Sequence, residues 1–174
     1  MKKLTLCLLS TAICITTATA GQIKKLDVEF ADAIWNGIAV PKGQQCLKFD
    51  GVNPETPRLK ISDIPANTTA VVMEYSDRAY KPMDNGGHGK IGYQVGPYTA
   101  SFIVPAVQGH TFELPPAFFS IAVHRGPDWD KAGAYMPPCS GGNNHPYHVM
   151  VKAVKQQGPE MIILAQHLLE MGRY

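Results

Sequence analysis

A histidine and a tyrosine two positions apart, His145 and Tyr147, directly follow a stretch that contains Gly141 and Gly142. Residues two apart on an extended segment point to the same side, so the imidazole and the phenol should be neighbours. Glycine amides can approach a ligand closely, and a protonated histidine adds a charged donor. These residues predict a site for a small anionic group. The alternative is that His145 bonds a backbone carbonyl of its loop, Tyr147 belongs to the core and the glycines form an ordinary turn.

A second glycine-rich stretch, residues 85–90, reads Asn-Gly-Gly-His-Gly-Lys and contains His88 and Lys90. Its glycines could bring the backbone and the lysine toward an anion, so His88 and Lys90 are candidates for the other half of the site. The competing interpretation is a hairpin turn whose side chains are solvated.

Catalytic and metal-binding motifs are missing from the sequence. It has no Gly-x-Ser-x-Gly elbow, no phosphate loop of nucleotide hydrolases, no Cys-x-x-Cys and no His-x-x-x-His. His145 paired with Asp77 or Asp128 could act as a general base, but no nucleophile is identifiable. His145 and His148, three positions apart, would point to opposite faces of a strand and could not share a metal. We therefore expect a binding protein that is not an enzyme and that uses no cofactor or metal.

Short β-rich runs must position these residues. Strands are predicted at 23–30, 69–75, 100–104 and 147–154, and loops rich in Gly, Pro, Asn and Asp at 54–57, 84–87 and 137–144. Apolar residues from Met161 to Leu169 recur at helical spacing after Gly158, which predicts one C-terminal helix that ends near Gly172. The pattern indicates an antiparallel β protein closed by that helix.

The N-terminus has the layout of a cleavable secretory signal. Lys2 and Lys3 precede an apolar stretch over residues 4–15, and Ala20 ends a run of small residues. The rival interpretation is a membrane anchor, but the stretch is shorter than the roughly 20 residues that a spanning helix needs. Cleavage near Ala20 would leave residues 21–174 as a single domain, periplasmic or secreted, without stable membrane insertion.

Two further features bound the function of the exported chain. Loss of both signal lysines would leave equal numbers of acidic and basic residues, which argues against nucleic acid as a partner. Cys46 and Cys139 would remain in an oxidising compartment, where they form either a disulfide or two separate thiols.

Five motifs follow one another between residues 40 and 174. They are the stretch 46–65 with Asp-Gly near its start, the strand 70–77, the Gly-Pro-Asp-Trp-Asp-Lys-Ala-Gly loop at 126–133, the Pro-Pro-Cys and His-Pro-Tyr-His-Val segments at 137–151, and the terminal Gly-Arg-Tyr. In this order they resemble the phosphatidylethanolamine-binding protein (PEBP) family, in its bacterial branch similar to Raf kinase inhibitors. The resemblance implies a mostly β fold, a PEBP-like antiparallel β-sandwich with peripheral loops and a C-terminal helix.

The resemblance also implies a shallow pocket in which an Asp, two His, a Tyr and a Gly/Pro-rich loop hold a phosphate or carboxylate. His145 matches the second pocket histidine, Tyr147 falls two residues on, and Pro138 lies in the matching loop.

The sequence departs from the family's pocket at two places. The Asp-Pro-Asp motif reads Tyr-Ser-Asp, so only Asp77 remains, and it could instead be a turn residue. The family's first pocket histidine begins a strand reading His-Trp-Val-Val-Tyr-Asn-Ile-Pro. Alignment of that strand on residues 102–105 puts Tyr98 at its position, with His88 as a nearby substitute.

We therefore expect an exported PEBP-like protein that binds a small anionic ligand, such as a phospholipid head group. The alternatives are an interaction or inhibitor module with a protein partner outside the cytoplasm, as the family's signalling regulators suggest, and a weak hydrolase. A homodimer is compatible with either binding role.

Overall fold

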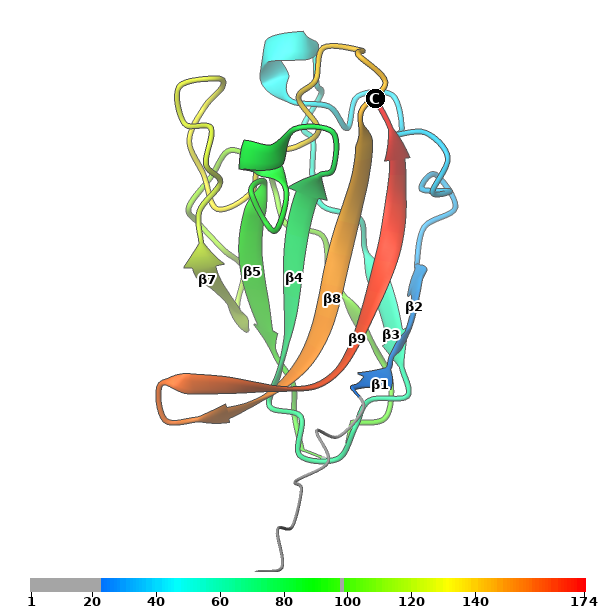
Figure 1. Cartoon of the computed structure of the whole chain (residues 1–174), viewed down its shortest axis with the longest axis vertical. Coiled ribbons are helices and arrows are strands. Elements are labelled where there is room, and N and C mark those ends of the chain that lie inside the picture. Colours follow the sequence, from blue (N-terminus) through cyan, green and yellow to red (C-terminus); the bar gives the residue numbers. More distant parts are fainter. Residues whose placement is uncertain (1–22, 98) are drawn as a thin grey trace, which may run out of the picture.

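The computed structural model describes residues 23–97 and 99–174, which form two β-sheets and two short 3-10 turns (Figure 1). The elements are β1 (Lys24–Lys25), β2 (Asp27–Phe30), η1 (Leu47–Phe49), β3 (Leu59–Ser62), β4 (Ala70–Asp77), η2 (Lys81–Met83), β5 (Gly89–Gln94), β6 (Phe102–Val104), β7 (Phe118–Ala122), β8 (Pro146–Gln157) and β9 (Glu160–Arg173). The predicted signal segment, residues 1–20, and Tyr98 lie outside the described residues.

The larger sheet has the strand order β1-β9-β8-β4-β5-β7 and the smaller sheet the order β2-β3-β6. Neighbouring strands are antiparallel, apart from the short parallel pairing of β1 with β9. The mostly β sandwich expected from the sequence is therefore present.

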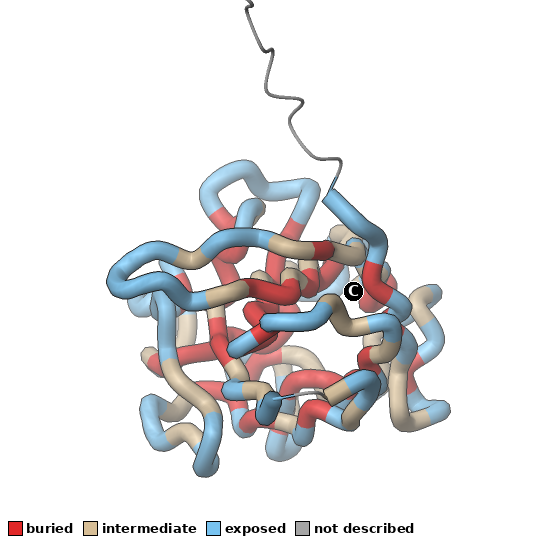
Figure 2. The backbone as a smooth tube through the Cα atoms, turned by 90° about the horizontal axis from the view of Figure 1, so that it is seen from below, coloured by how far each residue is buried: buried red, intermediate tan, exposed pale blue. Residues whose placement is uncertain are grey.

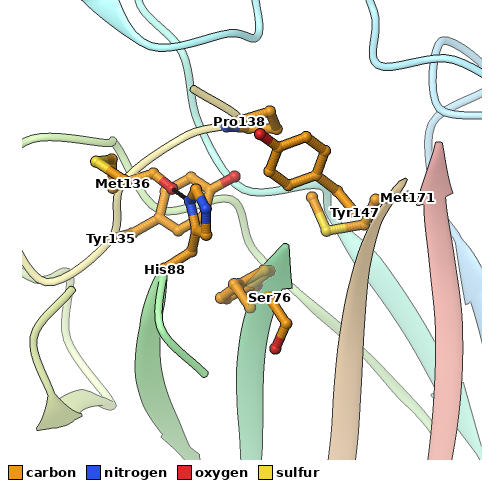
Figure 3. Close-up of a pocket in the computed structure, with 8 residues that line it drawn as sticks. Ser76, His88, Tyr135, Met136, Pro138, Tyr147 and Met171 are labelled. Carbon is orange, nitrogen blue, oxygen red and sulfur yellow. Dashed lines mark hydrogen bonds between the residues drawn. The ribbon is translucent and has the colours of Figure 1, made fainter. Parts of the chain in front are cut away.

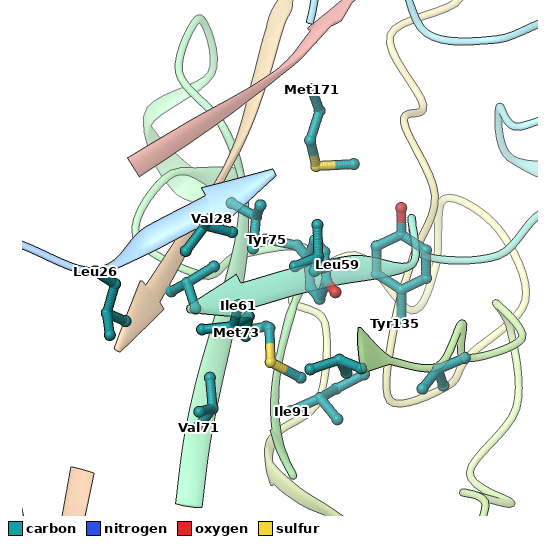
Figure 4. Close-up of a cluster of buried hydrophobic side chains, with 14 of the residues drawn as sticks. Leu26, Val28, Leu59, Ile61, Val71, Met73, Tyr75, Ile91, Tyr135 and Met171 are labelled. Carbon is teal, nitrogen blue, oxygen red and sulfur yellow. The ribbon is translucent and has the colours of Figure 1, made fainter. Parts of the chain in front are cut away.

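The core lies between the sheets, where alternate residues of each strand point inward. Val71, Met73 and Tyr75 of β4 meet Leu59 and Ile61 of β3 there (Figure 4). Each is almost completely buried, and burial of one such side chain contributes about 1.5–3 kcal/mol. Seen along the strands, buried stretches run through the middle of the molecule and exposed loops surround them (Figure 2).

The predicted C-terminal helix is wrong, because residues 160–173 form strand β9. This strand pairs with β8 from Gln157↔Glu160 to Pro146↔Arg173, with two register shifts. Its long ladder and the burial of Ala165 outweigh the helical spacing of its apolar residues. The Gly158-Pro159 pair, which suggested a helix start, is the two-residue turn of a long hairpin (Figure 1).

Substitution of Gly158 tests this turn. Its φ of +59° suits a two-residue hairpin, and a Cβ would meet nothing within 4 Å. We expect Gly158→Ala to lower the free energy of unfolding by about 1 kcal/mol through backbone strain alone. Gly158→Asn should cost less, because asparagine tolerates this conformation. Equal, negligible effects of both in urea denaturation would contradict the assignment.

Three strands were missed by the sequence analysis, namely β3, β5 and β7. Strand β5 has the sequence Gly-Lys-Ile-Gly-Tyr-Gln, and its glycines lower the strand signal. They are required by packing, since a Cβ at Gly92 would lie 2.2 Å from Phe119 Cζ, and at Gly89 2.1 Å from the Ala134 carbonyl oxygen. In the described parts of the chain, no helix is long and apolar enough to cross a bilayer.

Candidate ligand-binding site

The site residues gather at one end of the larger sheet, where β4 ends and β5 and β8 begin (Figure 1). Asp77 is the last residue of β4 and is directly opposite Tyr147 in the β4–β8 ladder. His145 lies just before β8, at the end of the 137–145 loop. Because β8 lies between β4 and β9, this register brings residues far apart in sequence to one place.

Asp77 and His145 form a close pair, with 2.6 Å between Oδ2 and Nδ1. The other carboxylate oxygen, Oδ1, accepts the Ala79 backbone N–H at 2.9 Å, so Asp77 also stabilises the turn that follows β4. The carboxylate accepts, so Nδ1 carries the proton and Nε2 is left for another partner. The Asp77 side chain is 5% exposed and that of His145 27%. The imidazole is therefore partly exposed to solvent, while the buried carboxylate fixes its orientation.

Tyr147 lies beside this pair and is buried, 2% exposed. Its hydroxyl oxygen accepts the Cys139 backbone N–H at 3.1 Å, and its phenol proton faces the Asp77 carboxylate. Burial raises the pKa of Tyr147, so the phenol stays protonated. The structure thus makes Tyr147 part of the buried interior and also places its polar end beside Asp77 and His145.

His88 lies on the other side of Tyr147, directly before β5 and next to β4. Its side chain is buried, so the expectation of a solvated hairpin side chain is wrong. Nδ1 donates to the Met136 carbonyl at 2.8 Å, and the ring meets Tyr147 edge-on with centroids 5.3 Å apart. Burial lowers the pKa of His88 to about 4, although the carbonyls of Met136 and Pro137 oppose the shift.

The position of His88 also bears on the alignment made from the sequence. The family's first pocket histidine starts a strand, and His88 precedes the strand that pairs with β4. Alignment on residues 102–105 instead places that strand at β6 (Phe102–Val104), which belongs to the smaller sheet.

Lys90 does not contribute to this site, so its prediction as part of the second half of the anion site is wrong. It points to the outer face of the larger sheet, where its Nζ is 3.2 Å from Glu74 Oε1. The same carboxylate pairs with Lys152 at 2.8 Å. The cause is strand alternation, since Ile91, the next residue, is in the core.

The glycine-rich loop at 137–144 lies beside these side chains, and its residues 141–144 form an exposed rim. Gly141 has a φ of +65° and Gly142 of +79°, and a Cβ at Gly141 would lie 2.9 Å from Phe49 Cζ. The loop is attached to segment 41–52 by a disulfide between Cys46 and Cys139, one of the two alternatives that the sequence allowed. The Cys46 N–H also donates to the Pro138 carbonyl at 2.9 Å.

Cys46, Cys139 and Asp130 are the group in the described ranges whose potential metal-ligand atoms lie close together. The disulfide occupies both sulfur atoms, so the group does not present thiolates to a metal in this form. Asp130 instead accepts the Lys48 backbone N–H at 3.0 Å and lies 3.3 Å from His110 Nε2.

A narrow space lies between His88, Tyr147 and the core. It measures about 140 Å³ and is too narrow to admit a water molecule. The lining residues are Tyr75, Ser76, His88, Tyr135, Met136, Pro138, Tyr147 and Met171 (Figure 3). The sequence identified three of these, Pro138, Tyr147 and His88. Tyr135 and Met171 carry no motif, and only their position in the fold brings them here.

Comparisons with known proteins support the fold. The structure is similar to the crystal structure of a phosphatidylethanolamine-binding protein homologue from Chlamydia trachomatis D/UW-3/CX, with a TM-score of 0.50 and 19% sequence identity over 87% of this chain and 97% of that one. No family model matches the sequence, and no curated protein matches it. The chain therefore has a PEBP-like fold.

Proposed function

We propose that this protein binds a small anionic ligand, phosphate-bearing or carboxylate, between His145, Tyr147 and the amides of the Gly141-Gly142 loop. The observation that carries the proposal is the Asp77–His145 pair, which fixes a partly exposed imidazole with Nε2 free. The PEBP-like fold supports a binding role, and a phospholipid head group is one ligand with the required chemistry.

The donors around His145 suit an anion. Tyr147 carries a phenol proton beside Asp77 and His145. Among the described residues, no backbone hydrogen bond engages the amides of Gly141 and Gly142, which lie in the exposed rim. A phosphate oxygen can accept hydrogen bonds from several donors at once, and charge-assisted hydrogen bonds to it are about twice as strong as neutral ones.

Binding is favoured over hydrolysis by the arrangement of hydroxyl groups. Asp77 and His145 have the geometry of a general-base pair, but covalent catalysis by such a pair needs a side-chain nucleophile within its reach. The nearby Ser140 hydroxyl donates to the Tyr174 backbone oxygen at 2.6 Å, and that bond keeps it from His145. We therefore propose a binding protein and not an enzyme.

We also propose that the chain acts outside the cytoplasm, after removal of a signal that ends near Ala20. The disulfide between Cys46 and Cys139 supports this location, because disulfides persist in oxidising compartments. Any protein partner would then be extracytoplasmic as well.

Ligand binding should be coupled to proton uptake by His145. Nδ1 already donates to Asp77, so an unprotonated phosphate oxygen can bond Nε2 only when that nitrogen is also protonated, whereas a phosphate O–H can donate to the neutral ring without net proton uptake. We expect calorimetric titration with inorganic phosphate near neutral pH, in two buffers of different ionisation enthalpy, to show net uptake of up to about one proton for each phosphate bound. His145→Gln should abolish the uptake and weaken binding by about tenfold, the effect of one lost hydrogen bond to a charged group.

The His145 imidazole signals in nitrogen NMR spectra should move in the same titration with inorganic phosphate or phosphoethanolamine. Lys90→Gln is the matched control, because it removes a cation from the opposite face of the sheet and should leave both readouts unchanged. A silent His145 signal at millimolar concentrations of both ligands would reject the proposed function.

A further inference from the structure

The hydroxyl group of Tyr135 is buried and has no hydrogen-bond partner among the described residues. The side chain is 1% exposed, and water cannot substitute, because the adjoining space is too narrow for it. A buried polar group without a partner destabilises a fold, so structures rarely keep one without a reason. Burial also raises the pKa of Tyr135 well above its ordinary value, so the group is a neutral phenol.

Tyr135 lines the same space as His88 and Tyr147 (Figure 3). The figure shows the rings of Tyr135 and His88 on one side and the ring of Tyr147 on the other. Tyr147 in turn reaches the Cys139 amide of the loop next to the Asp77–His145 pair. The space that contains the unpartnered hydroxyl, called the inner end below, is thus connected to the proposed anion site through Tyr147.

His88 gives this inner end a definite polarity. Its Nδ1 proton is committed to the Met136 carbonyl. Since the ring is neutral at physiological pH, Nε2 carries a lone pair and can only accept a hydrogen bond. The inner end therefore offers one fixed acceptor, His88, and one group that can donate, Tyr135.

We propose that Tyr135 and His88 form a neutral subsite for a hydroxyl group of the ligand, while its anionic group binds at His145. This inference rests on the proposed function and specifies the ligand class as a phosphate ester that carries a hydroxyl on its organic part. A hydroxyl can donate to His88 and accept from Tyr135 at once. A phosphate oxygen would face the lone pair of His88, and an ammonium group would be buried there without a counter-ion.

The subsite must widen when it is filled, and its lining permits this. Met136 and Met171 border the space, and both have unbranched, flexible side chains. Neither methionine side chain takes part in the Asp77–His145 pair or in the Cys139–Tyr147 hydrogen bond, so their movement does not require either contact to break.

The test compares glycerol 3-phosphate with n-propyl phosphate, which lacks the hydroxyl groups. We expect the wild-type protein to bind glycerol 3-phosphate about tenfold more tightly, as one extra buried hydrogen bond provides. Tyr135→Phe should remove this preference and leave the affinity for n-propyl phosphate unchanged. The same substitution should raise the melting temperature of the free protein, because it deletes an unpartnered buried oxygen.

Tyr75→Phe is the matched control for stability. Tyr75 is equally buried, but its hydroxyl is hydrogen-bonded to Thr56. Its removal should therefore lower the melting temperature, the opposite of the change expected for Tyr135→Phe.

The outcomes separate the inference from the proposed function. If neither phosphate ester binds and the His145 NMR signals do not shift, the proposed function and the neutral subsite are both rejected. If both esters bind wild type equally, or Tyr135→Phe keeps the preference, the neutral subsite is rejected while the anion site stands. The comparison of the two esters on wild type decides the point even if a variant fails to fold.

Discussion

Replacement of both Cys46 and Cys139 by serine should lower the free energy of unfolding by about 4 kcal/mol. The disulfide joins residues separated by 93 positions, and in the chain-entropy model a loop of that length restricts the unfolded chain by about 4–5 kcal/mol. A loss of this size is a large part of the total stability of a domain. Urea denaturation of the wild type and the double variant, both without reductant, measures it.

The same substitution should also weaken ligand binding. The disulfide holds the rim loop against segment 41–52, and the Cys139 backbone N–H donates a hydrogen bond to the Tyr147 hydroxyl oxygen. Without the covalent link that donor becomes mobile, so we expect a loss of affinity for inorganic phosphate of severalfold.

Reduction of the wild type provides the control for the serine side chains. Wild type with excess reductant should match the double variant in both stability and affinity. A stability difference below about 1 kcal/mol between oxidised wild type and the variant would contradict the prediction.

The sequence predicted the loops of this protein better than its strands, for a physical reason. Loops are specified locally by Gly, Pro, Asn and Asp, and the loop at 137–144 is where it was expected. Strand β9 has apolar residues whose spacing also fits a helix, and only the ladder with β8 decides its conformation. Strand β5 was missed because Gly89 and Gly92 are needed for close packing that a single sequence does not reveal.

The candidate site divides in a similar way. His145 and Tyr147 could be recognised because neighbouring positions of one segment carry both of them. Asp77 was a plausible partner, and the β4–β8 register brings its carboxylate to His145. Tyr135 could not be recognised, because an unpartnered hydroxyl becomes visible only when its surroundings are known.

His88 should make the protein less stable in acid. Its pKa is about 4 in the folded protein, through burial, against 6.5 for the unperturbed group in an unfolded chain. Above pH 6.5 the ring is neutral in both the folded and the unfolded state, so its titration does not change the free energy of unfolding. As the pH falls toward 4, only the unfolded chain gains the proton, so folding stability is progressively lost, by about 3 kcal/mol in total at 1.4 kcal/mol per pKa unit.

A variant that cannot titrate isolates this contribution. His88→Asn keeps an N–H near the position of Nδ1, so it can still donate to the Met136 carbonyl. It should be less stable than wild type at pH 7, because the smaller side chain leaves a void. From pH 7 to pH 4.5, however, it should lose about 2–3 kcal/mol less than wild type does.

When the pH dependence of the free energy of unfolding is compared between wild type and His88→Asn, the contributions of the other titrating groups cancel. Burial also lowers the pKa of His124 and His148, and both remain in wild type and variant alike, as do the carboxylates. Free energies of unfolding from urea curves at pH 7, 5.5 and 4.5 give the two slopes. Parallel slopes would mean that His88 takes up a proton in the folded protein as readily as in the unfolded chain, which would contradict the pKa lowered by burial.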